Sequence, residues 1–210
     1  MNKLNFKTMT MSYLKPNFMK TSKFFIGAMV CLSMITSCSN DDDAIPEQPN
    51  EEEVITDVTL TLVNNANPDD SVELKSVDPD GEDGPLTPVV TVSGNLTAGV
   101  TYTATVDIYN SIEDEDITEE VVEEEPDEHF FVYSIDGLDI DFSRSANDVV
   151  RADGNALGYE TTWVANSASS GSIRIQLFHE SETVNDDNEF GTQSGGSTDI
   201  DITFTDIAVQ

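Results

Sequence analysis

Two histidines that continue apolar alternations could provide the imidazoles of a transition-metal site. His129 stands two residues before Phe131, and His179 stands two residues after Leu177. Because alternate side chains of a strand share one face, both imidazoles are expected at the rim of a core. Neutral imidazole is a ligand for Zn²⁺, Cu²⁺ and Fe²⁺.

The order of the intervening segments predicts that these two histidines meet. If segments 129–135, 138–144, 158–164 and 171–179 alternate in direction, the first begins and the last finishes at the same end of the fold. Asp127 has the parity of the first histidine and is the expected third ligand, for a Zn²⁺, Cu²⁺ or Fe²⁺ ion. The alternative is that both histidines are rim residues that only hydrogen-bond or meet solvent.

A second candidate site is the loop DPDGEDG at residues 78–84, where closely spaced carboxylates alternate with glycines. Its candidate ligands are Asp78, Asp80, Glu82 and Asp83. Hard cations such as Ca²⁺ prefer oxygen ligands of this kind, although the glycine positions differ from those of an EF-hand loop. The loop is therefore either a calcium site or an acidic hairpin turn.

The N-terminus has the pattern of a bacterial lipoprotein. Residues 1–37 contain five lysines, no acidic residue and the apolar run 24–35, followed by Ile-Thr-Ser before Cys38. We interpret 1–37 as a cleaved signal peptide, starting at Met1 or at Met19, and Cys38 as the lipidated residue. Two or three acyl chains on this cysteine would make a stable membrane anchor.

Loss of this signal would leave a strongly acidic protein without thiols. From Cys38 onward four basic residues remain against 41 acidic ones, a formal net charge of −37. Such a charge repels nucleic acid and attracts cations. Cys31 would leave with the signal and Cys38 would carry lipid, so disulfides and cysteine catalysis are excluded.

The composition after the cysteine changes at residue 54. Residues 38–53 are rich in acids, prolines and amides, which predicts a disordered tether. The acids directly after Cys38 resemble the signal that carries some lipoproteins to the outer face of the outer membrane. We therefore expect a lipid-anchored outer-membrane protein, exposed at the cell surface.

The remainder, residues 54–210, is predicted to be one all-β domain. About nine segments alternate apolar and polar residues, with Asn-Pro, Asp-Gly and Gly-Gly turn signals between them. This pattern favours an antiparallel, immunoglobulin-like β-sandwich of eight or nine strands, with Trp163 in its core. One short acidic helix is expected after Asp116, because Asp-Ile-Thr-Glu has the character of a capping box and Pro126 stops the run.

Several motifs resemble a family of small acidic outer-membrane lipoproteins that carry the label "type 1 periplasmic binding fold superfamily protein". They are EDITEEVVEEEPDEHFFVY from Glu115, DPDGEDG, ADGNALG, LFHE and the closing STDIDITF. The family usually has an arginine before the second histidine, where this chain has Phe178. The resemblance implies a role beside TonB-dependent receptors, in capturing or passing a nutrient such as a metal.

Two functions of different classes follow. The first is a non-catalytic, lipid-anchored binding protein that captures a metal or metal chelate for a TonB-dependent receptor. The second is a structural or adhesive surface β-sandwich whose cations are only structural. The chain has no nucleophile elbow and no phosphate loop, so an enzyme is not expected.

Overall fold

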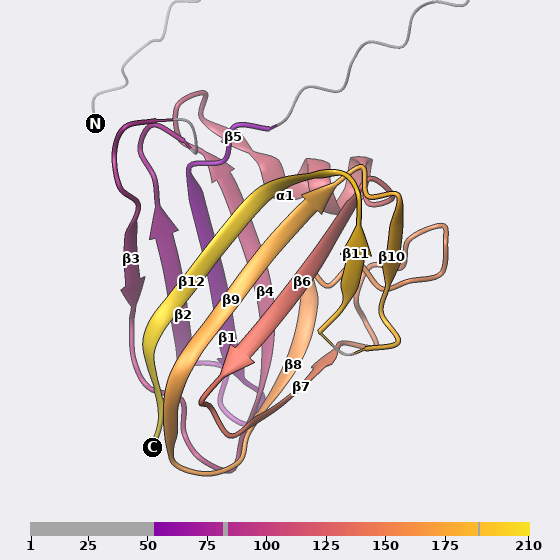
Figure 1. The fold of residues 1–210 in the computed structure, drawn as a ribbon. Helices are drawn as coiled ribbons and strands as arrows, with labels where there is room; N and C mark the ends of the chain where they lie inside the picture. The colour runs from indigo at the N-terminus through magenta and orange to yellow at the C-terminus, as the bar shows by residue number, and fades with distance from the viewer. Residues whose placement is uncertain (1–52, 82–83, 189) are drawn as a thin grey trace, which may run out of the picture. The chain divides into compact units, whose positions relative to one another are not determined.

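The computed structural model describes residues 53–81, 84–188 and 190–210, and this part of the chain folds into two antiparallel β-sheets that face each other (Figure 1). The larger sheet contains β1 (Asp57–Asn64), β2 (Ser71–Val77), β3 (Val89–Val92), β4 (Val100–Asn110), β5 (Glu115–Asp116), β7 (Ile140–Arg144) and β8 (Glu160–Ala165). The smaller sheet contains β6 (His129–Asp136), β9 (Ser169–His179) and β12 (Ser197–Val209). A separate hairpin is formed by β10 (Thr183–Asn185) and β11 (Thr192–Ser194). The predicted all-β, antiparallel architecture is confirmed.

The strand order of the larger sheet is β3-β2-β1-β4-β8-β7, with β5 paired to β4. The first four strands therefore form a Greek key, in which the fourth strand returns to lie beside the first. In the smaller sheet β9 lies between β12 and β6. The nine strands predicted from alternation are all present, whereas β5, β10 and β11 are too short to produce an alternation in the sequence.

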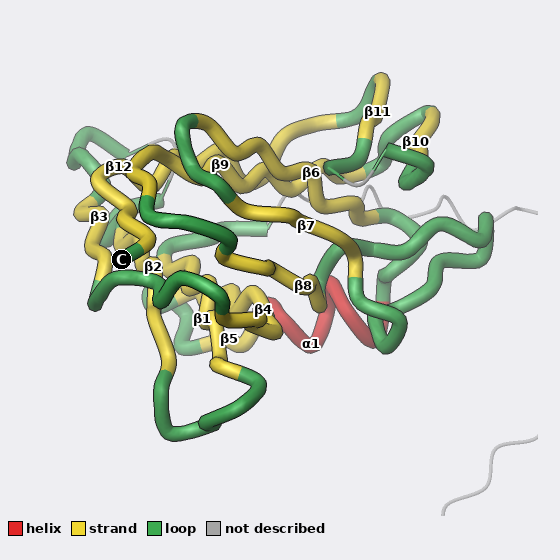
Figure 2. Tube along the Cα trace, turned by 90° about the horizontal axis from the view of Figure 1, so that it is seen from below, coloured by secondary structure: helices red, strands yellow, loops and turns green. Residues whose placement is uncertain are grey.

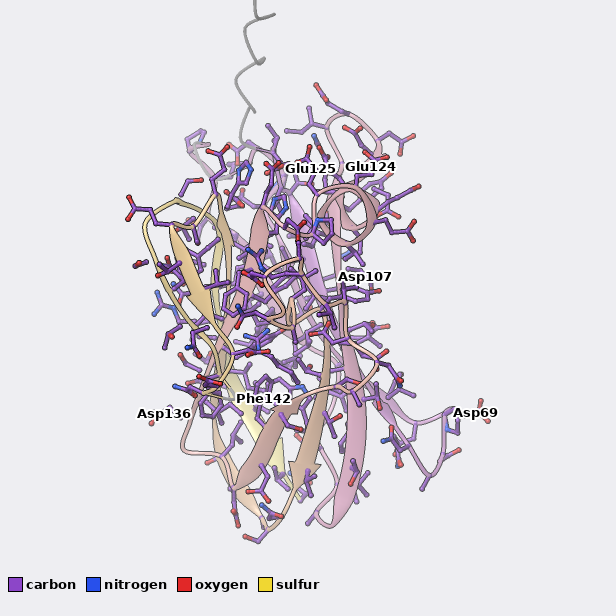
Figure 3. The ribbon with its side chains drawn as sticks, turned by 90° about the vertical axis from the view of Figure 1, so that its right-hand side faces the viewer. Asp69, Asp107, Glu124, Glu125, Asp136 and Phe142 are labelled. Carbon is purple, nitrogen blue, oxygen red and sulfur yellow. The ribbon has the colours of Figure 1, made fainter. Side chains whose placement is uncertain are left out.

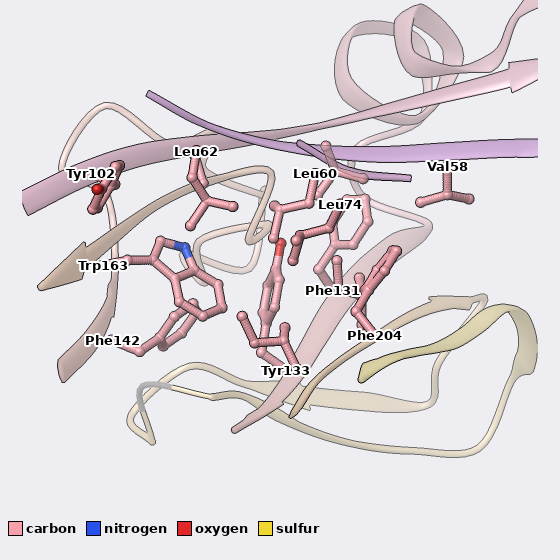
Figure 4. Packing of buried hydrophobic residues seen from close by; sticks show 14 of the residues in the cluster. Val58, Leu60, Leu62, Leu74, Tyr102, Phe131, Tyr133, Phe142, Trp163 and Phe204 are labelled. Carbon is pink, nitrogen blue, oxygen red and sulfur yellow. The ribbon is translucent and has the colours of Figure 1, made fainter. Parts of the chain in front are cut away.

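The core lies between the two sheets, where the inward side chains of both meet (Figure 4). Trp163 from the larger sheet is fully buried, as predicted, and its ring meets the ring of Phe142 edge-on at a centroid distance of 4.8 Å. Its indole N–H donates to Thr161 Oγ1 at 2.8 Å. Tyr133 from the smaller sheet donates its hydroxyl to the Gly158 carbonyl at 2.6 Å. Both buried aromatic polar groups are thus satisfied, as burial requires.

The predicted acidic helix begins where the sequence places it but soon changes form. Asp116 is the N-cap of α1 (Ile117–Glu119), and its carboxylate accepts a hydrogen bond from the Thr118 backbone N–H at 3.0 Å. A π-helical segment, η1 (Glu120–Glu124), follows and is closed by the Glu125 N–H, which donates to the Glu120 carbonyl at 2.8 Å. Ile117 and Val121 are buried, so the segment packs on the core through one face. No helix in the described residues is long and apolar enough to cross a membrane.

This helical segment marks one end of the sandwich. In Figure 1, β6 begins and β9 finishes beside α1, and the tube view of Figure 2 shows the same segment beyond the end of β4. Figure 3 places Glu124 and Glu125 at this end, away from Phe142 in the body of the sandwich. Carboxylates from the helix and imidazoles from the smaller sheet are therefore brought to one end by the connection between β4 and β6.

The predicted signal peptide, the lipidation site Cys38 and the tether as far as residue 52 lie outside the described residues. Glu53, which the composition assigned to the tether, is described, and only 5% of its side chain is exposed. It therefore belongs to the folded domain. Composition could not predict the burial of Glu53, because it describes a whole segment and not the contacts of its last residue.

Candidate metal centre

The two histidines lie opposite each other on neighbouring strands. The register of β6 and β9 pairs His129 directly with His179. Their rings stack with a centroid distance of 4.7 Å and an interplanar angle of 9°, and their exposed fractions are 0% and 3%. The strand parity that places Phe131 and Leu177 in the core also directs both imidazoles inward, at the end of the sandwich.

His129 is held with one nitrogen used and the other directed into the site. Its Nδ1 lies 3.1 Å from the Glu125 backbone carbonyl. Because a carbonyl can only accept a hydrogen bond, Nδ1 carries the hydrogen and the neutral ring has its lone pair on Nε2. Metal-binding histidines in proteins commonly donate their second N–H to a carbonyl in this way.

Glu53 faces that lone pair at an unusual distance. Its Oε1 lies 3.5 Å from His129 Nε2. Both oxygens of Glu53 and the Nε2 of His129 are buried. None of these three atoms has a hydrogen-bond partner among the described residues. A charge-assisted hydrogen bond would be about 2.7–2.9 Å. Two ligand atoms of a tetrahedral ion with bonds of about 2.0–2.1 Å are about 3.3 Å apart, so the gap resembles the spacing of metal ligands.

Asp199 completes the group through a β-bulge. Ligand atoms of Glu53, His129, His179 and Asp199 all lie within 4.8 Å of one another. The pairing of β12 with β9 skips Asp199, because Thr198 pairs with Phe178 and Ile200 pairs with Leu177. A bulge of this kind changes the direction of a side chain, and here it brings to the site a carboxylate that strict alternation would place on the opposite face from Ile200.

A glycine turn allows β12 to approach His179 closely. Gly195 and Gly196 both have positive φ angles, 73° and 74°. A Cβ atom on Gly196 would lie 2.2 Å from the carbonyl oxygen of His179. Only glycine fits this position, and it lets Ser197 pair with His179 so that Asp199 follows two residues later.

Asp127, the third ligand expected from the sequence, has a different role. Its Oδ1 accepts a hydrogen bond from the Ala152 backbone N–H at 2.6 Å, and it belongs to none of the candidate metal groups in the described residues. Arg151 lies beside it and donates to the carbonyls of Pro126 and His129. Asp127 thus helps to hold the loop before β6, while Glu53 and Asp199 are the carboxylates grouped with both imidazoles.

Two further groups of carboxylates adjoin the first one. Glu125, Glu128 and His179 form one, and Glu53, Glu120 and Glu125 form the other. His179 Nε2 lies 3.4 Å from Glu128 Oε2. Because Glu53 and His179 each belong to two groups, the potential ligands form one continuous cluster at this end of the sandwich.

The charges in the cluster influence one another. Burial lowers the pKa of His129, but the Glu53 carboxylate and the Glu125 carbonyl outweigh burial, and the pKa is raised above its ordinary value. Burial likewise raises the pKa of Glu53, but its interactions with His129 reverse the effect and lower it. Burial and the nearby charges of Glu53 and Glu125 raise the pKa of Glu120. The two shifts have one shared cause, which is the closeness of the His129 imidazole to the Glu53 carboxylate.

The candidate calcium loop brings two of its four carboxylates together. Burial and the adjacent Asp80 raise the pKa of Asp78, and Oδ1 of each residue is buried without a hydrogen-bond partner among the described residues. Asp80 also uses Oδ2 to accept from the Leu86 N–H at 3.2 Å, which closes the turn. Glu82 and Asp83 lie outside the described residues.

We expect Ca²⁺ to raise the melting temperature of the protein through this loop, because an ion that binds only the folded state stabilises it. The double variant Asp78→Asn, Asp80→Asn should show a clearly smaller increase than the wild type, measured by thermal unfolding with and without Ca²⁺. Asp69→Asn, an exposed aspartate of another loop, is the matched control. An equal increase with Na⁺ at the same ionic strength would show that only charge screening is involved.

Comparison of the chain with protein families, with characterised proteins and with solved structures found no match.

Sequence reasoning missed Glu53, Asp199 and Arg151. Glu53 was hidden by the polar composition of the preceding segment, and Asp199 by its position next to Ile200 in an apparently regular strand. The one sequence feature that could have indicated Asp199 is the double glycine before β12, which is typical of an irregular strand start.

Proposed function

We propose that the protein is a non-catalytic metal-binding lipoprotein, which captures a transition-metal ion or its chelate through Glu53, His129, His179 and Asp199. The observation that carries the proposal is the buried Nε2 of His129, which has no hydrogen bond and lies 3.5 Å from Glu53 Oε1. Two imidazoles and two carboxylates suit Zn²⁺, Cu²⁺ or Fe²⁺.

Binding would change the stacked arrangement of the rings. A metal lies near the plane of an imidazole that binds it, so two parallel rings cannot both hold one ion. At least one ring would rotate, and the ligand atoms would draw closer than the 4.8 Å that now bounds the group. The Glu53 and His129 ligand atoms already lie 3.5 Å apart before a metal binds.

A cleft beside the cluster has room for part of a chelate. It has a volume of about 190 Å³ and is bordered by Asp199 of the metal group. Its lining has an apolar part that includes Ile55, Leu86 and Ile202, together with polar residues such as Asp78 and Asp201. An organic ligand could pack on this apolar surface while its metal meets Asp199, so the proposal includes metal chelates.

The cellular setting of the proposal comes from the sequence. The lipoprotein pattern at Cys38 supports an anchor in the outer membrane, and the acids after it support display at the cell surface. The family resemblance supports a TonB-dependent receptor as the partner that receives the captured metal. A net charge of −37 after Cys38 would raise the local concentration of cations around the protein.

The test is Zn²⁺ titration of the full chain by calorimetry after chelator treatment. We expect one tightly bound Zn²⁺ per chain in the presence of excess Mg²⁺, which occupies non-specific carboxylate sites. The metal content of protein isolated without chelator should agree. Failure to retain Zn²⁺, Cu²⁺ or Fe²⁺ under these conditions would favour the alternative, a structural or adhesive surface protein.

A further inference from the structure

The carboxylates around the helical segment form a second group that shares Glu53 with the imidazole site. Oxygens of Glu53, Glu120 and Glu125 lie within 4.8 Å of one another, and the group contains no imidazole. It is contributed by the residue that leads into β1, by η1 and by the residue that follows η1. Two segments far apart in the sequence, the residue before β1 and the helical connection between β4 and β6, thus place carboxylates around one point.

Glu53 gives the independent indication of a ligand. Its side chain is 5% exposed, and both of its oxygens are buried without a hydrogen bond from the described residues. A buried ionised carboxylate is costly unless it is paired or bound to a metal. His129 Nε2, at 3.5 Å from Oε1, is farther away than a charge-assisted hydrogen bond of about 2.7–2.9 Å would place it.

We propose that Glu53, Glu120 and Glu125 bind a hard divalent cation such as Ca²⁺ or Mn²⁺, with Glu53 bridging this ion and the transition metal. The inference rests on the proposed imidazole site only through the shared Glu53. Carboxylates without nitrogen ligands suit Ca²⁺ and Mn²⁺, whereas imidazole suits Zn²⁺ and Cu²⁺. Two carboxylate oxygens that bind one Ca²⁺ are at most about 5 Å apart, and the oxygens of this group, all within 4.8 Å of one another, are compatible with that limit.

The surroundings of the second site favour hydrated cations. An open groove lined by Asp114, Glu115, Asp116, Glu119, Glu120 and Glu124 adjoins it, and Glu120 belongs to both. Ca²⁺ and Mn²⁺ bind water as well as carboxylates, and the open side can supply that water. The π-helical turn holds Glu120 within reach of Glu125, whose N–H bonds to the Glu120 carbonyl.

The test uses Mn²⁺ as the probe, in the full chain already loaded with one Zn²⁺. Electron paramagnetic resonance should show one bound Mn²⁺ per chain, which Ca²⁺ displaces. Glu120→Gln should weaken Mn²⁺ binding at least tenfold and leave Zn²⁺ affinity within threefold. Glu124→Gln, an exposed acid of the same segment, is the matched control and should retain Mn²⁺ binding.

The bridging role of Glu53 can be tested separately. With Cu²⁺ in place of Zn²⁺, the Mn²⁺ resonance should broaden or lose intensity, because two ions bridged by one carboxylate are about 4 Å apart and their spins couple. Glu53→Gln should weaken both sites, whereas His179→Ala should weaken only the transition-metal site. An unchanged Mn²⁺ resonance beside Cu²⁺ would overturn the bridge.

The two proposals can fail separately. If Zn²⁺ binds but no stoichiometric Mn²⁺ binds, or if Glu124→Gln has the same effect as Glu120→Gln, the second site is overturned and the transition-metal site remains. If Mn²⁺ binds and neither Zn²⁺ nor Cu²⁺ does, the proposed function is overturned.

Discussion

Replacement of His179 by alanine should lower the affinity of the protein for Zn²⁺ by at least about 100-fold, since loss of even an indirect partner of a metal ligand typically costs about 10–100-fold. The imidazole of His179 is 3% exposed and stacks on His129 at 4.7 Å, so its removal takes away one of the two buried nitrogen ligands. Asp199→Asn should cost about tenfold or more for the same reason. Calorimetric titration with Zn²⁺ measures both effects.

Asp127→Asn tests which carboxylate binds the metal, because the sequence predicts Asp127 as a ligand and the structure does not group it with the histidines. The Asp127 carboxylate is bonded to the Ala152 N–H and does not belong to the metal group. We therefore expect the variant to bind Zn²⁺ within about threefold of the wild type, which is far less than the loss of a ligand. A larger loss in Asp127→Asn than in Asp199→Asn would show that the structure assigns the wrong carboxylate. Circular dichroism would verify that each variant is folded.

Zn²⁺ affinity should fall by at least roughly 100-fold between pH 8 and pH 5.5, because a protonated imidazole cannot bind a metal and each of two imidazoles contributes about tenfold per pH unit below its pKa. The decline should begin above pH 6.5, since the pKa of His129 is raised by Glu53 and by the Glu125 carbonyl against the effect of burial. Titration at several pH values measures this. An affinity that is constant from pH 8 to pH 5.5 would exclude both histidines as ligands.

In the metal-free protein, the contribution of the pair of His129 and Glu53 to folding stability should increase as the pH falls. A histidine whose pKa is raised on folding contributes stability below its unfolded pKa, and this contribution is lost as the pH rises through the folded pKa. In Glu53→Gln burial remains while the carboxylate is gone, so the pKa of His129 should fall. Nuclear magnetic resonance of the imidazole protons across the pH range would measure the change, and a pKa unaltered by Glu53→Gln would contradict the pairing.

The sequence by itself determined the fold class and the inward direction of the histidines. Apolar side chains at every second position can be buried together only in strands with one covered face, so the segments around Leu60, Val106 and Ile175 had to form sheets. The same parity placed His129 and His179 on the core side. These inferences succeeded because they depend on local geometry, which is fixed by neighbours in the chain.

Only the tertiary structure decided which carboxylates accompany the imidazoles. Asp127 is near His129 in sequence, but hydrogen bonds across a loop turn it to Ala152. Glu53 reaches the site from the segment before β1, and Asp199 reaches it through a bulge in β12. Among 41 acidic residues, sequence spacing carries no information about such contacts, because long-range packing and a local break in strand pairing determine them.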